Sequence, residues 1–78
     1  MTRAVLLVGA TGLFGGHLAR QLARRTDMSL IVAGRRLPTL TALAQELGAE
    51  AVAFDRTDAT GVQAVLTRLR PFAVIDCS

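Results

Sequence analysis

Apolar residues in this chain fall into short continuous runs separated by longer segments with helical spacing. The runs cover residues 4–8, 29–33, 51–54 and 72–75, and polar side chains hardly interrupt them. Runs of this length and composition are typical of strands that are buried on both faces of a parallel sheet. The sequence therefore predicts four strands at these positions.

The first segment between strands has the periodicity of an amphipathic helix. Phe14, Leu18 and Leu22 recur at steps of four, which places them on one apolar face. Arginines lie near the end of this segment, and their positive charge suits the negative C-terminal end of a helix dipole. We expect this helix to continue to about Arg25.

Two further helices are predicted between the later strands. Pro38 fits the first turn of one of them, residues 40–47 supply its apolar stripe, and Gly48 is a C-terminal cap. Asp58 can cap the other helix, which Pro71 ends.

Strands and helices thus alternate along the whole chain, with connections short enough for right-handed crossovers. This order predicts an α/β fold of three layers, Rossmann-like, with a parallel sheet of strand order 3-2-1-4. We expect residues 1–78 to form one domain, the N-terminal part of a doubly wound fold in a longer protein. One sheet edge then has no partner in the sequence, so two copies could pair there as a homodimer.

Three glycines stand at the junction of the first strand and the first helix. Gly9, Gly12 and Gly15 have the spacing G-x-x-G-x-x-G in the strand–turn–helix context of a dinucleotide-binding turn. We expect Gly9 to allow the tight turn, Gly12 to let a pyrophosphate approach the backbone, and Gly15 to let helix and strand pack closely.

The start of the first helix would supply the donors for such a phosphate group. Helix N-termini carry free N–H groups and a positive dipole end. We expect the amides of Leu13 and Phe14 to donate, with the Thr11 hydroxyl nearby, and Gly16 to serve packing. The alternative is a tight strand–helix turn with no ligand.

The end of the second strand indicates which dinucleotide would bind. Sites for NAD carry an acidic residue here, but the sequence has Gly34, Arg35 and Arg36, and Asp27 comes too early. Two guanidinium groups suit a 2′-phosphate by charge and by hydrogen-bond geometry, which predicts NADP. One of them could instead stack on adenine, or the pair could be an exposed basic turn.

Several other residues are weaker candidates for a binding site. Asp55 ends the third strand, where it could meet the adenine amino group or simply close a turn. Cys77 and Ser78 should lie at the carboxyl end of the fourth strand, near the path of the nicotinamide half, although Cys77 could be a small buried residue. His17 is interpreted as a surface residue, and one His with one Cys gives no metal site.

Composition and charge limit which other classes of function fit the chain. The net charge is +3 and all nine basic residues are arginine, but they are scattered, and the three aromatic residues are phenylalanines in hydrophobic contexts. Nucleic-acid binding is not expected from this arrangement. A single cysteine forms no intrachain disulfide, the apolar runs are too short to cross a membrane, and no leader is evident, so we expect a cytoplasmic protein.

Residues 8–19, 32–36 and 74–77 together resemble the NADP-binding domain of the saccharopine dehydrogenase-like family. The resemblance covers nearly the whole chain and implies a nicotinamide-dependent oxidoreductase. By matching positions it implies cofactor contacts at Gly9, Thr11, Gly12, Leu13, Phe14, Gly34, Arg35 and Arg36.

Two alternatives share the same glycine turn. It also looks like the turn of extended and atypical short-chain dehydrogenases, but the Tyr-x-x-x-Lys pair of those enzymes is absent, because the chain has neither Tyr nor Lys. Related proteins sense NADP without turning it over, and no general acid or base is evident in the chain. A non-catalytic NADP sensor therefore remains open.

Overall fold

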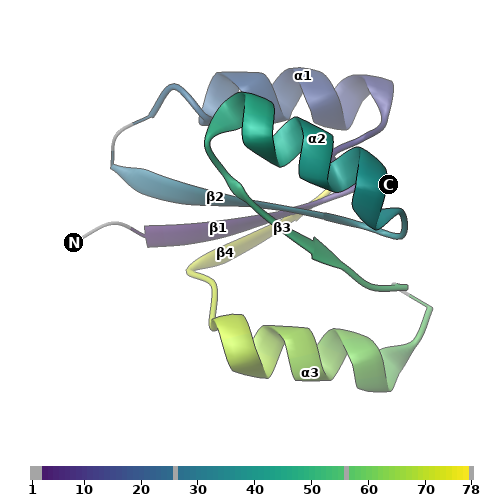
Figure 1. Ribbon diagram of the computed structural model, residues 1–78. Helices are drawn as coiled ribbons and strands as arrows, with labels where there is room; N and C mark the ends of the chain where they lie inside the picture. The colour runs from purple at the N-terminus through teal and green to yellow at the C-terminus, as the bar shows by residue number, and fades with distance from the viewer. Residues whose placement is uncertain (1–2, 26, 56, 78) are drawn as a thin grey trace.

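A computed structural model describes residues 3–25, 27–55 and 57–77, and in these ranges four strands alternate with three helices (Figure 1). Ser78, expected at the end of the fourth strand, lies outside the described residues. The elements are β1 (Arg3–Val8), α1 (Leu13–Leu22), β2 (Met28–Gly34), α2 (Leu37–Leu47), β3 (Glu50–Ala53), α3 (Ala59–Leu69) and β4 (Ala73–Asp76).

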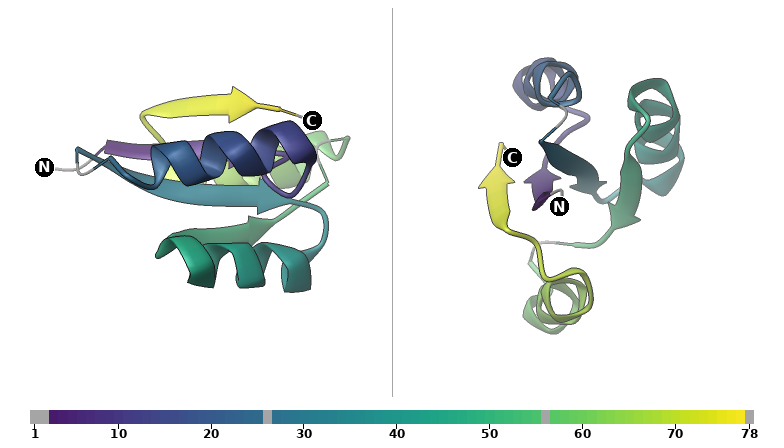
Figure 2. Two further views of the ribbon diagram at one scale, coloured as in Figure 1. Left: turned by 90° about the horizontal axis from the view of Figure 1, so that it is seen from above. Right: turned by 90° about the vertical axis from the view of Figure 1, so that its left-hand side faces the viewer.

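The strands form one parallel sheet in the order β3-β2-β1-β4, which confirms the predicted topology. In the register, Leu6 of β1 lies between Ile31 of β2 and Val74 of β4. Figure 2 shows α1 and α2 on one face of the sheet and α3 on the other. The molecule therefore has the three layers that the alternating pattern predicted.

Burial on both faces explains why the first two strands lack polar alternation. Leu7 and Val32 are fully buried in a cluster that also contains residues of α1 and α2. Their neighbours Leu6 and Ile31 point to the opposite face, where Leu66 of α3 packs against them. Each of these two strands thus supplies apolar side chains to two separate halves of the core.

The predicted helix signals at the second and third helices are confirmed. Pro38 lies in the first turn of α2, and Gly48 ends that helix in the left-handed conformation with φ of 66°. The side chain of Asp58 caps α3 by accepting a hydrogen bond from the Gly61 amide. The longest helices of the described ranges have eleven residues, and none is long and apolar enough to cross a membrane.

The end of α1 differs from the prediction. The helix stops at Leu22 rather than near Arg25, because the Arg24 and Arg25 amides bond to carbonyls three residues back and tighten the last turn. Arg25 then forms an ion pair with Asp27 at 2.8 Å, which holds the turn into β2.

Two phenylalanines are not in the apolar surroundings that the sequence predicted. Phe14 is 70% exposed in the first turn of α1. Phe72 is 65% exposed and lies just before β4, which begins one residue later than expected. The Arg3 guanidinium covers the Phe72 ring at 4.5 Å from its centroid.

Candidate functional site

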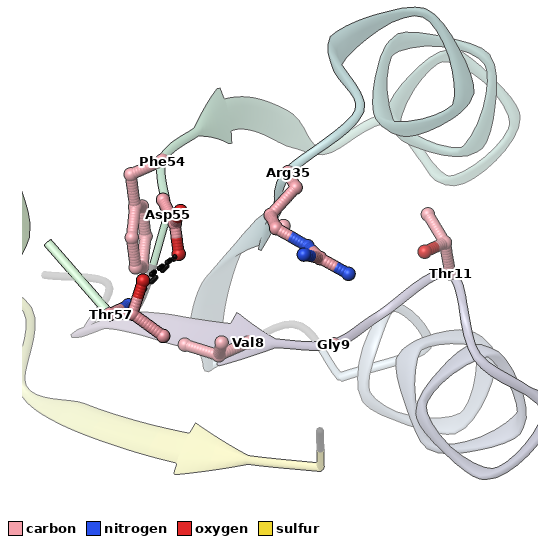
Figure 3. Close-up of a pocket in the computed structure, with 8 residues that line it drawn as sticks. Val8, Gly9, Thr11, Arg35, Phe54, Asp55 and Thr57 are labelled. Atoms are coloured by element: carbon pink, nitrogen blue, oxygen red, sulfur yellow. Dashed lines mark hydrogen bonds between the residues drawn. The ribbon is translucent and has the colours of Figure 1, made fainter.

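The carboxyl ends of β1, β2 and β3 meet at one edge of the sheet because the three strands are parallel. A pocket of about 330 Å³ opens at this edge (Figure 3). It is lined by Val8, Gly9, Thr11, Gly34, Arg35, Phe54, Asp55 and Thr57. Open α/β sheets bind ligands at this edge, beside the point where the strand order reverses. Here the order reverses between β1 and β4, and the pocket lies next to that point, at the ends of β1, β2 and β3.

The glycine turn leaves β1 abruptly at the rim of the pocket. Gly9 has φ of 81°, a conformation that side-chain-bearing residues rarely adopt. Its amide donates to the Ala33 carbonyl at 3.0 Å, and its carbonyl accepts from the Gly12 amide at 3.2 Å. These two bonds tie the turn to β2 and fold it back toward α1.

Gly12 and Gly15 are required for different reasons. A Cβ on Gly15 would collide with the backbone of Gly9, so α1 can approach the turn this closely only with glycine there. A Cβ on Gly12 would meet its nearest atom, the Gly9 carbonyl oxygen, at an ordinary 3.5 Å, and the backbone there is extended. The fold of the described residues therefore gives no reason for a glycine at position 12.

The N-terminus of α1 has no side-chain cap. Gly12 is the N-cap residue, the first turn contains no acidic residue, and Leu13 is 97% exposed. The first intrahelical bond runs from the Gly16 amide to the Gly12 carbonyl at 2.8 Å. In α3, by contrast, Asp58 fills the capping position. The first amides of α1 are thus available to an anion.

The structure separates the two arginines of the predicted pair. Arg35 lines the pocket, and Figure 3 shows its guanidinium extending across the opening toward Thr11. Arg36 is not among the lining residues. It is the N-cap residue of α2, where its carbonyl accepts from the Leu40 amide at 3.1 Å.

Asp55 lies on the opposite wall and both closes a turn and lines the pocket. Its Oδ1 accepts hydrogen bonds from the Thr57 hydroxyl at 2.7 Å and the Thr57 amide at 2.9 Å. These bonds hold the pKa of the Asp55 carboxyl below its ordinary value, and the positive charge of Arg35 lowers it further. The pocket therefore presents a guanidinium and an ionised carboxylate at neutral pH.

The sequence did not single out Thr57 or Phe54. The only signal for Thr57 was its position two residues after an aspartate, the spacing at which Asx turns form. Phe54 follows β3, and its amide bonds to the Gly34 carbonyl at 2.9 Å. Its half-buried ring stands beside Asp55 and Thr57 in Figure 3.

Cys77 and His17 are not among the residues that line this pocket. Cys77 is half-buried, packs against the core on the side of α1, and donates its amide to the Val8 carbonyl at 2.9 Å. His17 is exposed on α1, as predicted, and contacts Gln21 at 3.2 Å. Within the described ranges, no group of three or more His, Cys, Asp or Glu residues is placed to hold a metal ion.

A second cavity, of about 380 Å³, lies between α3 and the sheet. It shares Val8, Phe54 and Thr57 with the first pocket, and its other lining residues are Leu6, Val62, Leu66, Val74 and Asp76. Most of this lining is apolar, unlike the charged rim of the first pocket.

Comparison with known families identifies the domain. The family described as saccharopine dehydrogenase NADP binding domain matches residues 5–78. The chain belongs to this family. The match includes the glycine turn, Arg35, most of β1 and the other three strands, so this is an NADP-binding domain by family.

Solved structures support the same assignment. Saccharopine dehydrogenase (L-Glu forming) from Saccharomyces cerevisiae is 32% identical with a TM-score of 0.85, over 97% of this domain and 16% of that chain. A protein described as a short-chain oxidoreductase from Thermus thermophilus is 36% identical with a TM-score of 0.84, over 94% of this domain and 35% of that chain.

A curated relative extends the comparison to a much larger protein. A subunit of the phenolphthiocerol/phthiocerol polyketide synthase of Mycobacterium tuberculosis is 40% identical over an alignment of 68 residues that covers 81% of this chain. The match spans only 4% of that relative's length. The 78 residues thus correspond to a minor part of each of these proteins.

Proposed function

We propose that this domain holds NADP(H) in the pocket at the carboxyl ends of β1, β2 and β3, as the cofactor-binding part of an oxidoreductase. The observation that carries the proposal is the meeting of the glycine turn, Arg35 and Asp55 around one cavity. Membership of an NADP-binding domain family supports the same ligand.

The N-terminus of α1 is assigned to the pyrophosphate. Its first amides have no capping side chain, and Gly12 leaves room for close approach to the backbone. The amides of Leu13 and Phe14 would donate to phosphate oxygens, and the Thr11 hydroxyl borders the pocket beside them. When bound, the nicotinamide group would supply hydride transfer.

Arg35 is assigned to the 2′-phosphate, and Asp55 to the amino group of adenine. Arg35 reaches into the pocket from the end of β2, the position from which the adenosine ribose is recognised in this fold. A guanidinium binds a phosphate dianion through charge and paired N–H donors. Arg36 contributes positive charge from outside the cavity, so of the predicted pair only Arg35 carries the specificity in this proposal.

Calorimetric titration with NADP+ and NAD+ tests the assignment. Arg35→Ala is the test variant, and Arg36→Ala is the matched control, because it removes an adjacent arginine that does not line the pocket. We expect NADP+ to bind about tenfold tighter than NAD+, a difference of about 1.4 kcal/mol. Arg35→Ala should abolish this preference, and Arg36→Ala should keep most of it.

Equal losses in the two variants would contradict the assignment to Arg35. If the 78-residue chain binds neither nucleotide, the same titration on any longer protein that contains it decides the matter. Absence of binding there too would overturn the proposed function.

A second candidate is a domain that binds NADP(H) without chemistry of its own. It is favoured by the absence, among the described lining residues, of a histidine, a tyrosine or a lysine that could exchange a proton with a substrate. Reduction or oxidation of any carbonyl or imine substrate by a protein containing this domain, with loss of that activity in Arg35→Ala, would exclude the second candidate.

A further inference from the structure

The loop between β3 and α3 holds one side chain of the pocket unusually firmly for an exposed segment. Both hydrogen bonds from Thr57 converge on a single oxygen, Oδ1 of Asp55. The Asp55 carbonyl also accepts from the Asp58 amide at 2.9 Å, which ties the same residue to the start of α3. Asp55 is therefore held by hydrogen bonds to its backbone carbonyl and to its side chain.

This restraint matters because an exposed aspartate otherwise samples several rotamers. A side chain that is already ordered loses less conformational entropy when a ligand binds. With Oδ1 occupied by Thr57, the other carboxylate oxygen is the one left to meet a base at the pocket wall. An ionised carboxylate accepts hydrogen bonds and cannot donate one. It would attract an exocyclic amino group and repel a carbonyl oxygen in the same place.

We propose that Thr57 is a positioning residue that fixes Asp55 as an acceptor, so that the pocket selects dinucleotides with a 6-aminopurine over those with a 6-oxopurine. The inference rests on the proposed function, because it assumes that the adenosine half of NADP(H) occupies this pocket. It adds a base-reading element to a site whose other polar groups we assign to phosphates.

A structural role for Thr57 has to be distinguished from this one. Thr57 lies at the start of the segment leading into α3, so its replacement could change the stability of that helix. A purely structural role would weaken binding of all dinucleotides alike. A positioning role changes the ratio of affinities for two bases while both ligands keep the same phosphates.

The experiment compares NADP+ with nicotinamide hypoxanthine dinucleotide phosphate, in which a carbonyl oxygen replaces the adenine amino group and N1 of the base carries a hydrogen. Affinities are measured for the wild-type chain, Thr57→Val and Thr57→Ser. We expect the wild type to prefer NADP+ by about tenfold, as for one hydrogen bond to a charged group. Thr57→Val keeps the shape but loses the hydroxyl, so the preference should fall by about threefold or more. Thr57→Ser should restore it.

A second variant keeps the test decisive if Thr57→Val folds poorly. In Asp55→Asn, the two Thr57 donors require the amide oxygen at the Oδ1 position, which places the amide nitrogen where the other carboxylate oxygen was. The preference should then shift toward the hypoxanthine dinucleotide.

Three outcomes have different consequences. Normal NADP+ binding with an unchanged base preference in both Thr57→Val and Asp55→Asn would overturn this inference and leave the proposed function standing. A parallel loss of affinity for both ligands in Thr57→Val, with no change in their ratio, would assign Thr57 a structural role only. Absence of NADP+ binding by the wild type would overturn the proposed function, and the inference with it.

Discussion

Gly12 and Gly15 belong to one motif, but a side chain at each position would meet different surroundings. At Gly15 a methyl group would overlap the Gly9 backbone, which cannot move aside without breaking the turn. At Gly12 the chain offers ordinary contact distance and extended backbone geometry. Glycine at position 15 is required by the fold of the turn, and glycine at position 12 by the ligand we propose.

Gly12→Ser should therefore separate stability from binding. Serine is a good N-cap residue, so the free energy of unfolding should stay constant or rise by about 0.3 kcal/mol. The added side chain would accept from one amide of this first turn and stand where we place the pyrophosphate, so NADP+ affinity should fall by about tenfold or more. Urea unfolding and calorimetry measure the two effects, and unchanged affinity would contradict the phosphate assignment.

Gly15→Ala, unlike Gly12→Ser, is expected to lower the free energy of unfolding. Overpacking of a close contact costs about 1–3 kcal/mol, although alanine inside a helix ordinarily gains up to about 1 kcal/mol over glycine. A net loss of unfolding free energy in urea denaturation therefore reports the overlap with Gly9. A variant as stable as the wild type would show that α1 can move away from the turn.

The two charged residues of the pocket predict different pH profiles. The bonds from Thr57, with a further contribution from Arg35, keep the pKa of Asp55 below the ordinary value of about 3.9, so this carboxyl stays ionised above about pH 4. A phosphate monoester takes up its second proton near pH 6. The preference for NADP+ over NAD+ should weaken as the pH falls from about 7 to about 5. The preference for adenine over hypoxanthine should not change over that range. Titrations at both pH values measure these ratios, and a base preference that falls in parallel would contradict the role of Asp55.

Residue types and spacing were sufficient to predict the glycine turn and a basic residue at the end of β2. They could not separate Arg35 from Arg36, because the direction of each side chain depends on where α2 begins. Thr57 was missed for a related reason: its importance comes from the Asp55 oxygen that it holds, not from any motif. Contacts between neighbouring side chains in a loop leave little trace in sequence patterns.

At the level of elements, α1 and α3 differ in how they begin. The first turn of α3 is capped by Asp58, whereas that of α1 has no side-chain cap and follows the glycine turn that lines the pocket. Asp58→Ala should lower the free energy of unfolding by about 0.5–2 kcal/mol, as expected for loss of an N-cap. Asp58→Ser is the control and should retain most of the stability in urea denaturation. A destabilisation of equal size in both variants would count against capping as the cause.

Element positions were predictable where a single local signal fixes them. Gly48 and Asp58 mark helix ends by their own conformation or side chain, and both predictions are confirmed. The end of α1 was placed too late, because arginine has a high helix propensity and Arg24 and Arg25 extend the helical pattern. The helix instead ends where the Arg24 and Arg25 amides bond to carbonyls three residues back, and periodicity does not record such a tightening of the last turn.

At the level of the whole molecule, β4 forms one edge of the sheet and β3 the other. Within the described residues the hydrogen-bonded neighbour of β4 is β1 alone, and Val74 is 50% exposed. Edges of this kind pair readily with another chain. We expect the 78-residue chain to self-associate as its concentration rises in sedimentation velocity experiments.

Val74→Lys should suppress that association, because a charge on an edge strand opposes pairing. Gln45→Lys is the matched control, since it adds the same charge to the exposed surface of α2. A wild-type chain that stays monomeric at high concentration, or equal behaviour of the two variants, would contradict pairing through β4.

The strand order has a consequence for how the protein is made. β1 leaves the ribosome first, yet it lies inside the sheet and gains its second neighbour only when β4 has been synthesised. At about 5–20 residues per second, translation from Val8 to Ala73 takes roughly 3 to 13 seconds. Throughout that interval one side of β1 is an unpaired edge in the nascent chain. Of the two interior strands, β1 is therefore the one that waits longest for its second neighbour.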